Sequence, residues 1–567
     1  MQYKFKFPFF YKLFISIFIV FSCNHKPSGT LSKNGMVSSA HPLASKVGIE
    51  ILKKGGNAFD AAIAVHFALA VVYPQAGNLG GGGFAIYRLE NGQTGSLDFR
   101  EKAPNMSSRD MYLINKEGDL VVDGNKSRIG HLASGVPGSV DGMLKLYEKF
   151  STKNWSELIS PSINYAENGF KITKKQSRGL NNVRESFEKV NDKPIAFLKE
   201  SNWEEGDLLI QKDLAKTLNR IKDDKRDGFY SGITADLIVE EMNSGSGIIT
   251  HEDLKNYSSL WRDPIIGSYK GHKIISMGPP SSGGIALLQL LHGADQHNTS
   301  NYEHNSINYI NLLTEIESRV YADRATYLGD DDFYDVPKSS LLDKNYLNSK
   351  FNTINKDIKT KSSDIKSGNI VINESEETTH FSIVDSFGNA VSVTTTINSS
   401  FGSKVVVDGA GFLLNNEMDD FSIKPGFPNM FGLVGGEANA IEPNKRMLSS
   451  MTPTILEKND KLFMVLGTPG GSTIITSVFQ TILNVIDYNM GMQEAVDSKK
   501  FHHQWLPDVL VVEEETLSDE LSNRLTQIGH KIVKRSSLGR MDCILIKEDG
   551  SLEGGADKRG DNSAIGY

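Results

Sequence analysis

Two threonine-bearing segments are the strongest candidates for chemistry in this sequence. Thr378 and Thr379 follow a polar tract, and Thr396 lies in a second run that ends at Asn398. A threonine hydroxyl is a weak nucleophile unless a base lies beside it, and a free α-amine on the same residue can be that base. An α-amine has a pKa of about 7.7 to 8.0, so part of it is unprotonated at neutral pH. Thr378 can act in this way only if the bond between Glu377 and Thr378 is cut.

The segment from 378 to 398 has the pattern of a β-hairpin. Two strand-like runs flank a turn at Phe387-Gly388-Asn389, and the second run alternates apolar side chains with hydroxyl and amide side chains. A tight turn there places Thr378 opposite residues 396 to 398, within one residue. Threonine is also a good strand former, so the pattern by itself fits an ordinary hairpin at least as well.

Other residues could hold an amino acid beside such a nucleophile. Arg100, Ser449 and Ser450 could bind a carboxylate, the arginine through a bidentate fork. Glu417 and Asp420 could bind an ammonium group. Taken singly, each has an ordinary explanation: the arginine fits a surface ion pair, the acidic residues a solvated turn, and the serines a helix cap.

Two glycine-rich segments stand out. The run from Gly80 to Gly83 carries a large backbone entropy cost, which indicates that the backbone approaches another backbone or a ligand closely. Gly470 and Gly471 lie between a predicted strand and an apolar helix, so their N–H groups could receive an anion or a developing oxyanion. Neither segment has the lysine of a nucleotide-binding loop, and no metal-ligand spacing stands out among the 13 histidines. The sequence therefore predicts no cofactor and no metal.

Hydrophobic periodicity predicts both helices and strands. The principal helices are expected at 42–52, 58–72, 155–168, 286–291, 307–327 and 472–486, and the strands at 84–89, 274–277, 462–466, 509–512 and 543–547. Residues 349–377 contain few large apolar side chains, so this tract is expected to be flexible or to lie on the surface.

Composition bounds the class of protein. The 567 residues suffice for two to four domains or one large enzyme fold. The net charge is -8, and no basic run of note occurs outside the extreme N-terminus, which argues against nucleic acid as a partner.

The first residues have the pattern of an export signal. Lysines at 4, 6 and 12 precede an apolar run from 13 to 21 that is too short to span a bilayer. Cys23 after this run predicts a lipoprotein signal over residues 1–22, a lipid on Cys23 and a tether over 23–37. Phe21 is bulkier than that pattern usually has, so a plain secretory signal stays open. Cys543 is the other cysteine, and after processing no intramolecular disulfide is expected.

Several motifs together carry a family resemblance. In the second part of the chain they are TTHFSIVDSFGNAVSVTTTIN, FGSK, LLNNEMDDF, KRMLSSMTPTI and GTPGGS. In the first part they are SAHPLAS, GGNAFDAA, VVYPQAGNLGGGGF, DFREKAP, GVPGS, MGPPSSGG and YADRATYLGD. In type and order, from about residue 38 to 567, they resemble the γ-glutamyltransferase family, N-terminal nucleophile enzymes that act on glutathione.

The resemblance implies a fold and a maturation. The fold is α/β, a four-layer αββα sandwich of the N-terminal nucleophile hydrolase type, formed jointly by two subunits of one precursor. The precursor would cut itself before Thr378, giving a large subunit, 38–377, and a small subunit, 378–567, that stay together as a heterodimer. Thr378 would then be the nucleophile, with Thr396 hydrogen-bonded to it.

The resemblance also implies substrate contacts. The γ-glutamyl α-carboxylate would lie on Arg100, Ser449 and Ser450, the α-amine on Asn398, Glu417 and Asp420, and the oxyanion on Gly470 and Gly471. Many bacterial relatives have glutamine where this chain has Glu417. The loop 425–436 resembles a lid in which Phe431 replaces a common tyrosine, and we expect a leakier lid and a larger share of hydrolysis.

The implied reaction cleaves the γ-glutamyl amide of glutathione and related compounds and transfers the group to water or to an acceptor amino acid or dipeptide. The protein would be periplasmic or anchored to the outer membrane of a Gram-negative-type bacterium, with the lipid as its sole membrane attachment. Two alternatives remain. A related acylase on β-lactam-type amides would not need the ammonium-binding residues, and a non-catalytic envelope lipoprotein would not need Thr378, Thr396 and the glycine motifs.

Overall fold

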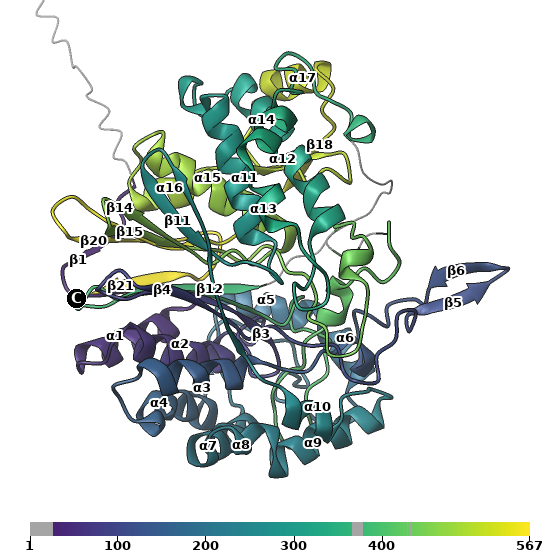
Figure 1. Cartoon of the computed structure of the whole chain (residues 1–567). Helices are drawn as coiled ribbons and strands as arrows, with labels where there is room; N and C mark the ends of the chain where they lie inside the picture. The colour runs from purple at the N-terminus through teal and green to yellow at the C-terminus, as the bar shows by residue number, and fades with distance from the viewer. Residues whose placement is uncertain (1–26, 366–377, 428, 431) are drawn as a thin grey trace, which may run out of the picture.

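The structure, a computed structural model, describes residues 27–365, 378–427, 429–430 and 432–567 (Figure 1). The predicted leader with Cys23, Glu377 at the predicted cut, and Phe431 in the predicted lid lie outside these ranges. In the described part of the chain, no helix is both long enough and apolar enough to cross a bilayer.

Two seven-stranded sheets, antiparallel throughout, form the centre of the molecule. In spatial order the first contains β1 (Thr30–Ser32), β20 (Leu552–Ala556), β19 (Asp542–Ile546), β15 (Lys461–Leu466), β14 (Thr454–Lys458), β11 (His272–Ser276) and β10 (Ile265–Tyr269). The second contains β21 (Ser563–Gly566), β2 (Met36–Ser39), β12 (Thr379–Val384), β13 (Ala390–Thr396), β3 (Gly82–Arg88), β4 (Thr94–Asp98) and β9 (Leu260–Arg262). Each sheet therefore combines strands from before and after residue 377.

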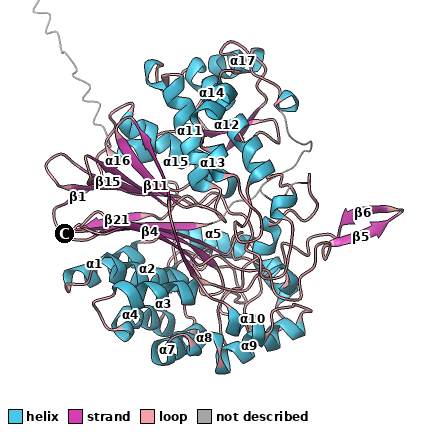
Figure 2. Ribbon diagram, in the orientation of Figure 1, coloured by secondary structure: helices cyan, strands magenta, loops and turns pink. Residues whose placement is uncertain are grey.

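Helices cover the outer sides of this pair of sheets (Figure 2). On the side of the second sheet lie α1 (Pro42–Lys53), α2 (Ala58–Val72), α3 (Ser139–Phe150), α4 (Trp155–Asn168), α7 (Lys212–Asp224), α8 (Asp227–Tyr230), α9 (Gly232–Ser244) and α10 (His251–Asn256). On the side of the first lie α11 (Gly283–Gln296), α12 (Ile307–Tyr327), α13 (Lys338–Leu341), α14 (Lys344–Phe351), α15 (Ile474–Ile486), α16 (Met492–Asp497) and α17 (Asp519–Gln527). The predictions for 42–52, 58–72, 155–168 and 307–327 are confirmed to within one residue.

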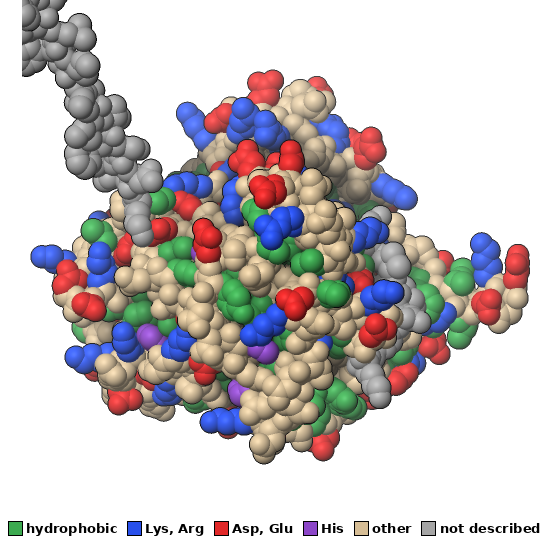
Figure 3. Space-filling view, turned by 90° about the horizontal axis from the view of Figure 1, so that it is seen from above, with side chains coloured by type: hydrophobic (Ala, Val, Ile, Leu, Met, Phe, Trp, Pro, Cys, Tyr) green, Lys and Arg blue, Asp and Glu red, His purple; other side chains and the backbone are tan. Residues whose placement is uncertain are grey.

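The remaining elements lie outside these layers. They are α5 (Lys174–Asn182), α6 (Arg184–Val190), the three-stranded sheet of β16 (Phe501–His502), β17 (Leu510–Glu513) and β18 (Ile532–Arg535), and the pairs β5 (Leu113–Lys116) with β6 (Asp119–Val122) and β7 (Phe170–Lys171) with β8 (Leu208–Leu209). The β5–β6 hairpin projects away from the body in Figure 1. On the face shown in Figure 3, lysine and arginine side chains are interspersed with aspartate and glutamate.

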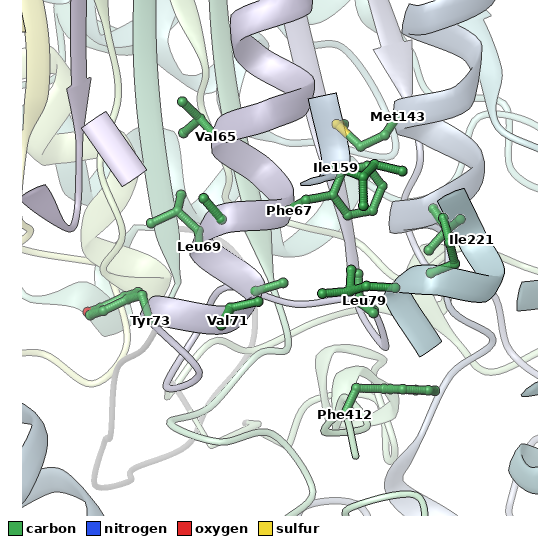
Figure 4. Packing of buried hydrophobic residues seen from close by; sticks show 14 of the residues in the cluster. Val65, Phe67, Leu69, Val71, Tyr73, Leu79, Met143, Ile159, Ile221 and Phe412 are labelled. Carbon is green, nitrogen blue, oxygen red and sulfur yellow. The ribbon is translucent and has the colours of Figure 1, made fainter. Parts of the chain in front are cut away.

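Helix α2 forms the centre of the core beneath the second sheet. Asn57 and Asp60 cap each other at its start, so two backbone N–H groups that the helix leaves free find acceptors. All 15 of its residues are buried, because its alanines let neighbouring helices approach closely. Phe67 lies among the apolar side chains Met143 of α3 and Ile159 of α4 (Figure 4).

The hairpin of β12 and β13 has the predicted register. Thr379 pairs with Thr395, and extending the ladder by one residue sets Thr378 opposite Thr396. The Asp385 carboxylate holds the turn by accepting hydrogen bonds of 2.9 Å from two of its backbone N–H groups. These bonds fix the turn and, through it, the residues at the open end of the hairpin.

The two faces of the hairpin differ as the alternation predicts. Val393 packs into the core that contains α2, whereas Ser392 Oγ donates to Leu466 O in the other sheet at 3.1 Å. Ser382 Oγ donates to Asp542 O, also in the other sheet, at 2.9 Å. Hydroxyl groups therefore cross-link the two sheets where they face each other.

Residues 349–365 lie mostly on the surface, as predicted for the tract 349–377, but they are anchored at a few buried side chains. Phe351 and Ser362 are buried. Lys359 forms an ion pair with Asp508, and Trp505 Nε1 donates to Ser362 O at 3.0 Å. Polar segments can be buried when distant segments supply their partners, and composition does not reveal those partners.

Candidate active site

Thr378 and Thr396 lie at the open end of the β12–β13 hairpin with both side chains buried. Thr396 Oγ1 accepts a hydrogen bond of 2.7 Å from Asn398 N. Asn398 has a φ of 69°, the left-handed conformation that asparagine adopts more readily than most residues. Its Nδ2 donates to Asn416 O at 3.0 Å, which leaves the side-chain oxygen as an acceptor.

The glycine run from 80 to 83 brings the segment after β4 close to β13. A Cβ on Gly81 would lie 2.0 Å from Thr396 O, and a Cβ on Gly82 would lie 2.6 Å from Glu101 Oε2. No side chain fits at either position. The prediction that these glycines allow a close backbone approach is confirmed.

Arg100 follows β4 and is fully buried. Its N–H donates to Asp98 Oδ1 at 2.9 Å, and its carbonyl oxygen accepts from the Tyr257 hydroxyl at 2.8 Å. The guanidinium Nη1 lies 2.6 Å from Glu417 Oε2, and Nη2 lies 2.6 Å from Asp420 Oδ2. The residues expected at opposite ends of a bound amino acid therefore pair with one another in this structure.

Burial and mutual charge change the ionisation of this cluster. Burial would lower the pKa of Arg100, but three neighbouring carboxylates outweigh burial and hold that pKa above its usual value. Burial raises the pKa of Glu417 well above its usual range, against the opposing charge of Arg100. Burial also raises the pKa of Asp420, and it raises the pKa of Glu101 to about 7. Part of this carboxyl cluster is therefore protonated near neutral pH.

Ser449 and Ser450 lie in the segment before β14 and line the same pocket as Arg100. Ser449 N donates to Pro280 O at 2.9 Å, so the turn before α11 fixes the backbone of the pair. Ser449 Oγ accepts from Met451 N at 3.1 Å. Ser450 Oγ accepts from Arg324 Nη2 at 3.0 Å.

Arg324 lines the pocket, although sequence reasoning assigned it no role. It is buried near the end of α12, and its Nε donates to Ser282 Oγ at 3.0 Å. Burial lowers the pKa of Arg324. A signal for it was present in the sequence, because Arg324 lies within YADRATYLGD, one of the motifs that carry the family resemblance.

Gly470 and Gly471 form the turn between β15 and α15. Their φ angles are 140° and 51°, so both adopt backbone conformations that favour glycine. Thr473 fixes the turn, because its N–H and its hydroxyl both donate to Gly470 O. Within the described ranges, the N–H groups of Gly470 and Gly471 have no acceptor. They are free to receive a negative charge.

One small pocket joins these groups. Its lining residues come from both sides of residue 377: Arg100, Arg324, Thr378, Thr396, Asn398, Glu417, Asp420, Leu433, Ser449, Ser450, Met451, Gly471 and Ile474. Of the predicted catalytic and substrate-binding residues that the structure describes, Gly470 alone is absent from this lining. The pocket volume is about 20 Å³, room for about one water molecule. An amino acid can enter only if the surrounding side chains move.

A larger pocket lies elsewhere in the described part of the chain. Its volume is about 560 Å³, its lining includes α9 residues and the segment 406–409, and it contains none of the predicted catalytic or substrate-binding residues. The chemistry of the threonines and charged groups, rather than pocket size, identifies the candidate site. In the part of the chain that the structure describes, no group of three or more His, Cys, Asp or Glu side chains could hold a metal ion.

Comparisons with known proteins identify the family of this chain. A family model described as Gamma-glutamyltranspeptidase matches residues 44–567. The chain is 44% identical over 539 residues to a Glutathione hydrolase proenzyme of Escherichia coli (strain K12), covering 94% of this chain and 92% of that protein. The structure of Helicobacter pylori gamma-glutamyltranspeptidase is 48% identical, with a TM-score of 0.56 over 58% of this chain and 94% of that chain.

The overall fold also resembles a second kind of enzyme. The structure of cephalosporin acylase from Bacillus halodurans has a TM-score of 0.82 at 24% identity, over 96% of this chain and 97% of that chain. At this identity the likeness shows the fold alone. The mixed α/β architecture with two large antiparallel sheets is shared with these structures.

Proposed function

This chain belongs to the gamma-glutamyltranspeptidase family, and we propose that it is a proenzyme that cuts itself before Thr378 and then acts as a glutathione hydrolase and γ-glutamyltransferase. One observation carries the proposal. A single pocket brings Thr378 and Thr396 together with a guanidinium, two serine hydroxyls and a carboxyl pair. The amino-acid end of a γ-glutamyl group matches this set, because its carboxylate and ammonium groups share one carbon.

Maturation would begin when the Thr378 hydroxyl attacks the carbonyl carbon of Glu377. An ester forms as the peptide bond breaks, and the Thr378 nitrogen takes up the proton and becomes a free amine. Water then hydrolyses the ester, so that the large subunit, 38–377, ends at Glu377 and the small subunit, 378–567, begins at Thr378. Because each sheet contains strands from both sides of the cut, the two subunits stay together. They share a four-layer αββα sandwich of the N-terminal nucleophile hydrolase type.

Catalysis would then use the new α-amine as the base. It removes the hydroxyl proton of Thr378 while the oxygen attacks the γ-carbonyl carbon, and the Thr396 hydroxyl positions that oxygen. The N–H groups of Gly470 and Gly471 stabilise the oxyanion. The leaving amine, Cys-Gly when glutathione is the substrate, departs with the proton. Water or the amino group of an acceptor amino acid or dipeptide attacks the γ-glutamyl ester and regenerates Thr378.

Substrate recognition would exchange internal ion pairs for external ones. Glu417 and Asp420 now occupy the guanidinium of Arg100. The substrate carboxylate would bind Arg100 and the hydroxyls of Ser449 and Ser450. The substrate ammonium group would bind the carboxylates released from Arg100 and the side-chain oxygen of Asn398. A zwitterion therefore supplies a partner both for Arg100 and for the carboxyls that it releases.

An acylase is the second candidate, because the fold likeness to cephalosporin acylase favours it. A glutaryl group would bring a carboxylate without an ammonium group, and the displaced acidic pair would stay buried without a cation. Each of these carboxyls that stayed ionised would be an unpaired buried charge, which costs about 3 to 5 kcal/mol. The acidic pair therefore favours the γ-glutamyl substrate.

The N-terminal segment supports a proposal on location. Residues 1–22 would direct export and Cys23 would carry the lipid. The predicted tether over 23–37 is too long, because β1 (Thr30–Ser32) and β2 (Met36–Ser39) belong to the two sheets; the residues between Cys23 and β1 would tether the enzyme in the periplasm or at the outer membrane. Labelling the wild type and Cys23→Ala with a radioactive fatty acid tests this part, and a wild type without label contradicts it.

The enzymatic proposal is tested with the full chain and Thr378→Ala. The wild type should give two fragments, the smaller starting at Thr378 by N-terminal sequencing, and should release the amine of a γ-glutamyl anilide. Thr378→Ala should stay intact and inactive. Thr379→Ala is the matched control, because the neighbouring hydroxyl is buried without a hydrogen-bond partner among the described residues; this variant should be cut normally. An intact but active wild type, or a cut elsewhere, would overturn the mechanism.

A further inference from the structure

Arg324 is a buried charge for which the proposed reaction has no role. It is 5% exposed and lines the same pocket as Thr378. On the same helix, the buried Arg319 has a carboxylate partner, Glu315, at 2.8 Å. Among the described residues Arg324 has no such partner. A buried cation without a close carboxylate is costly, and the more distant charge of Asp420 does not outweigh the burial of Arg324.

Arg324 fixes the direction in which the Ser450 hydroxyl can donate. A guanidinium has N–H donors and no acceptor, so Ser450 Oγ must accept the 3.0 Å bond from Nη2. The hydroxyl proton stays available, and no described residue accepts it. Ser449 has the same arrangement, because its Oγ accepts from Met451 N. Both hydroxyls are thus set as donors, which is what a carboxylate requires.

The same guanidinium also holds the backbone of the serine pair. Its Nε donates to Ser282 Oγ at 3.0 Å, and Ser282 Oγ donates to Ser449 O at 2.7 Å. One side chain of α12 therefore orients the Ser450 hydroxyl directly and the Ser449 backbone through one intermediate. Loss of this arginine would loosen both donors together.

The charges around Arg100 also indicate a role for Arg324. Three carboxyls, those of Glu101, Glu417 and Asp420, lie within 4 Å of the Arg100 guanidinium. A substrate carboxylate that approaches Arg100 competes with whichever of these three carboxyls are ionised. We infer that Arg324 is the positioning residue that makes this pocket select an α-carboxylate, through the orientation of Ser450 and through its own positive charge. The inference rests on the proposed γ-glutamyl substrate.

The test compares two substrates that differ only in the α-carboxylate. γ-Glutamyl-p-nitroanilide carries it, and 4-aminobutyryl-p-nitroanilide keeps the ammonium group without it. For Arg324→Gln we expect the KM of the first substrate to rise about 10- to 100-fold, the effect of one charged hydrogen bond. Its kcat should change little, and kcat/KM for the second substrate should stay within about threefold. Arg319→Gln, on the same helix, controls for loosening of α12 and should preserve the wild-type preference.

The outcomes separate this inference from the proposed function. A wild type that releases no amine from γ-glutamyl-p-nitroanilide rejects the proposed function and the inference with it. An active wild type combined with equal losses on both substrates, or an unchanged KM, rejects the inference alone. If Arg324→Gln is not cut into two fragments, Arg324→Met carries the test, because it keeps an unbranched side chain and loses both the charge and the N–H donors; a wild-type KM in this variant overturns the inference. The double variant with Ser450→Ala should raise KM by less than the product of the single effects, and independent effects would refute action through Ser450.

Discussion

Glu101 should give substrate binding a pH dependence that Glu101→Gln removes. Its carboxyl is fully buried, and Oε2 lies 3.4 Å from Arg100 Nη1. Burial raises the pKa of Glu101 to about 7, with Arg100 opposing the shift and Asp420 and Asp98 adding to it. Above that pH the ionised carboxylate competes with the substrate carboxylate for Arg100. At an effective dielectric constant of 20, charges at 3.4 Å interact by about 5 kcal/mol, so the form that binds substrate is the protonated one.

The size of the KM change follows from the proton that Glu101 must take up when the substrate binds. One pH unit above the pKa this uptake costs about 1.4 kcal/mol, so the wild-type KM for γ-glutamyl-p-nitroanilide should be about tenfold higher at pH 8 than at pH 6. Glu101→Gln should remove this rise. The α-amine of Thr378 titrates in the same range but must be unprotonated to act, so it appears as a rise of kcat with pH in both proteins. A flat wild-type KM, or the same slope in both proteins, refutes the role of Glu101.

The same pKa shift predicts the sign of a stability change. The folded state holds the Glu101 proton up to about pH 7, whereas the usual pKa of a free glutamate is 4.5. Between these values the folded state binds more protons than the unfolded state, so the free energy of unfolding falls as pH rises. In Glu101→Gln the free energy of unfolding should fall less between these pH values, because the titrating carboxyl is absent. Urea unfolding at pH 5 and pH 7 measures it, and parallel changes in both proteins contradict the shift.

Three further substitutions test the segments that surround the two threonines. Gly81→Ala would press a Cβ to within 2.0 Å of Thr396 O and should impair self-cleavage on a gel; Gly179→Ala, whose nearest neighbour lies at 3.4 Å, should be cut like the wild type. Asp385→Ala removes the acceptor of two turn N–H groups and should lower the free energy of unfolding by about 2 kcal/mol in urea; an unchanged value would show that the turn holds without it. Phe431→Tyr should lower the share of hydrolysis relative to transfer, and an unchanged ratio removes the idea of a leakier lid.

Much of the fold was predictable because its signals are local. Alternation along 390–398 separates a face that packs on helices from a face that bears hydroxyls, and the structure has both. Helix α2 begins after Asn57, which caps it, and ends at Val72 as its periodicity predicts. Such patterns need only neighbouring residues to be read.

The interactions that were not predicted join distant segments. The pairing of Arg100 with Glu417 and Asp420 spans more than half of the chain, and each partner had been given a separate role. Arg324 went unassigned because its hydrogen-bond partners, Ser282 and Ser450, come from two other segments. Periodicity and composition carry no information on such pairs, which form only when the sheets and helices are assembled.

The hairpin that carries Thr378 depends on strands from the first part of the chain. β2 pairs with β12 on one side, and β3 pairs with β13 on the other. Gly81 lies so close to Thr396 O that an added Cβ would come within 2.0 Å of it, so the contacts that place the two threonines form only after the N-terminal strands have joined the sheet. The proposed cut needs that placement, and the α-amine that serves as base exists only after the cut. In the proposed mechanism the topology therefore sets the order of events: a chain that has not assembled its second sheet is not cut, and an uncut Thr378 has no free α-amine to act as the base toward a substrate amide.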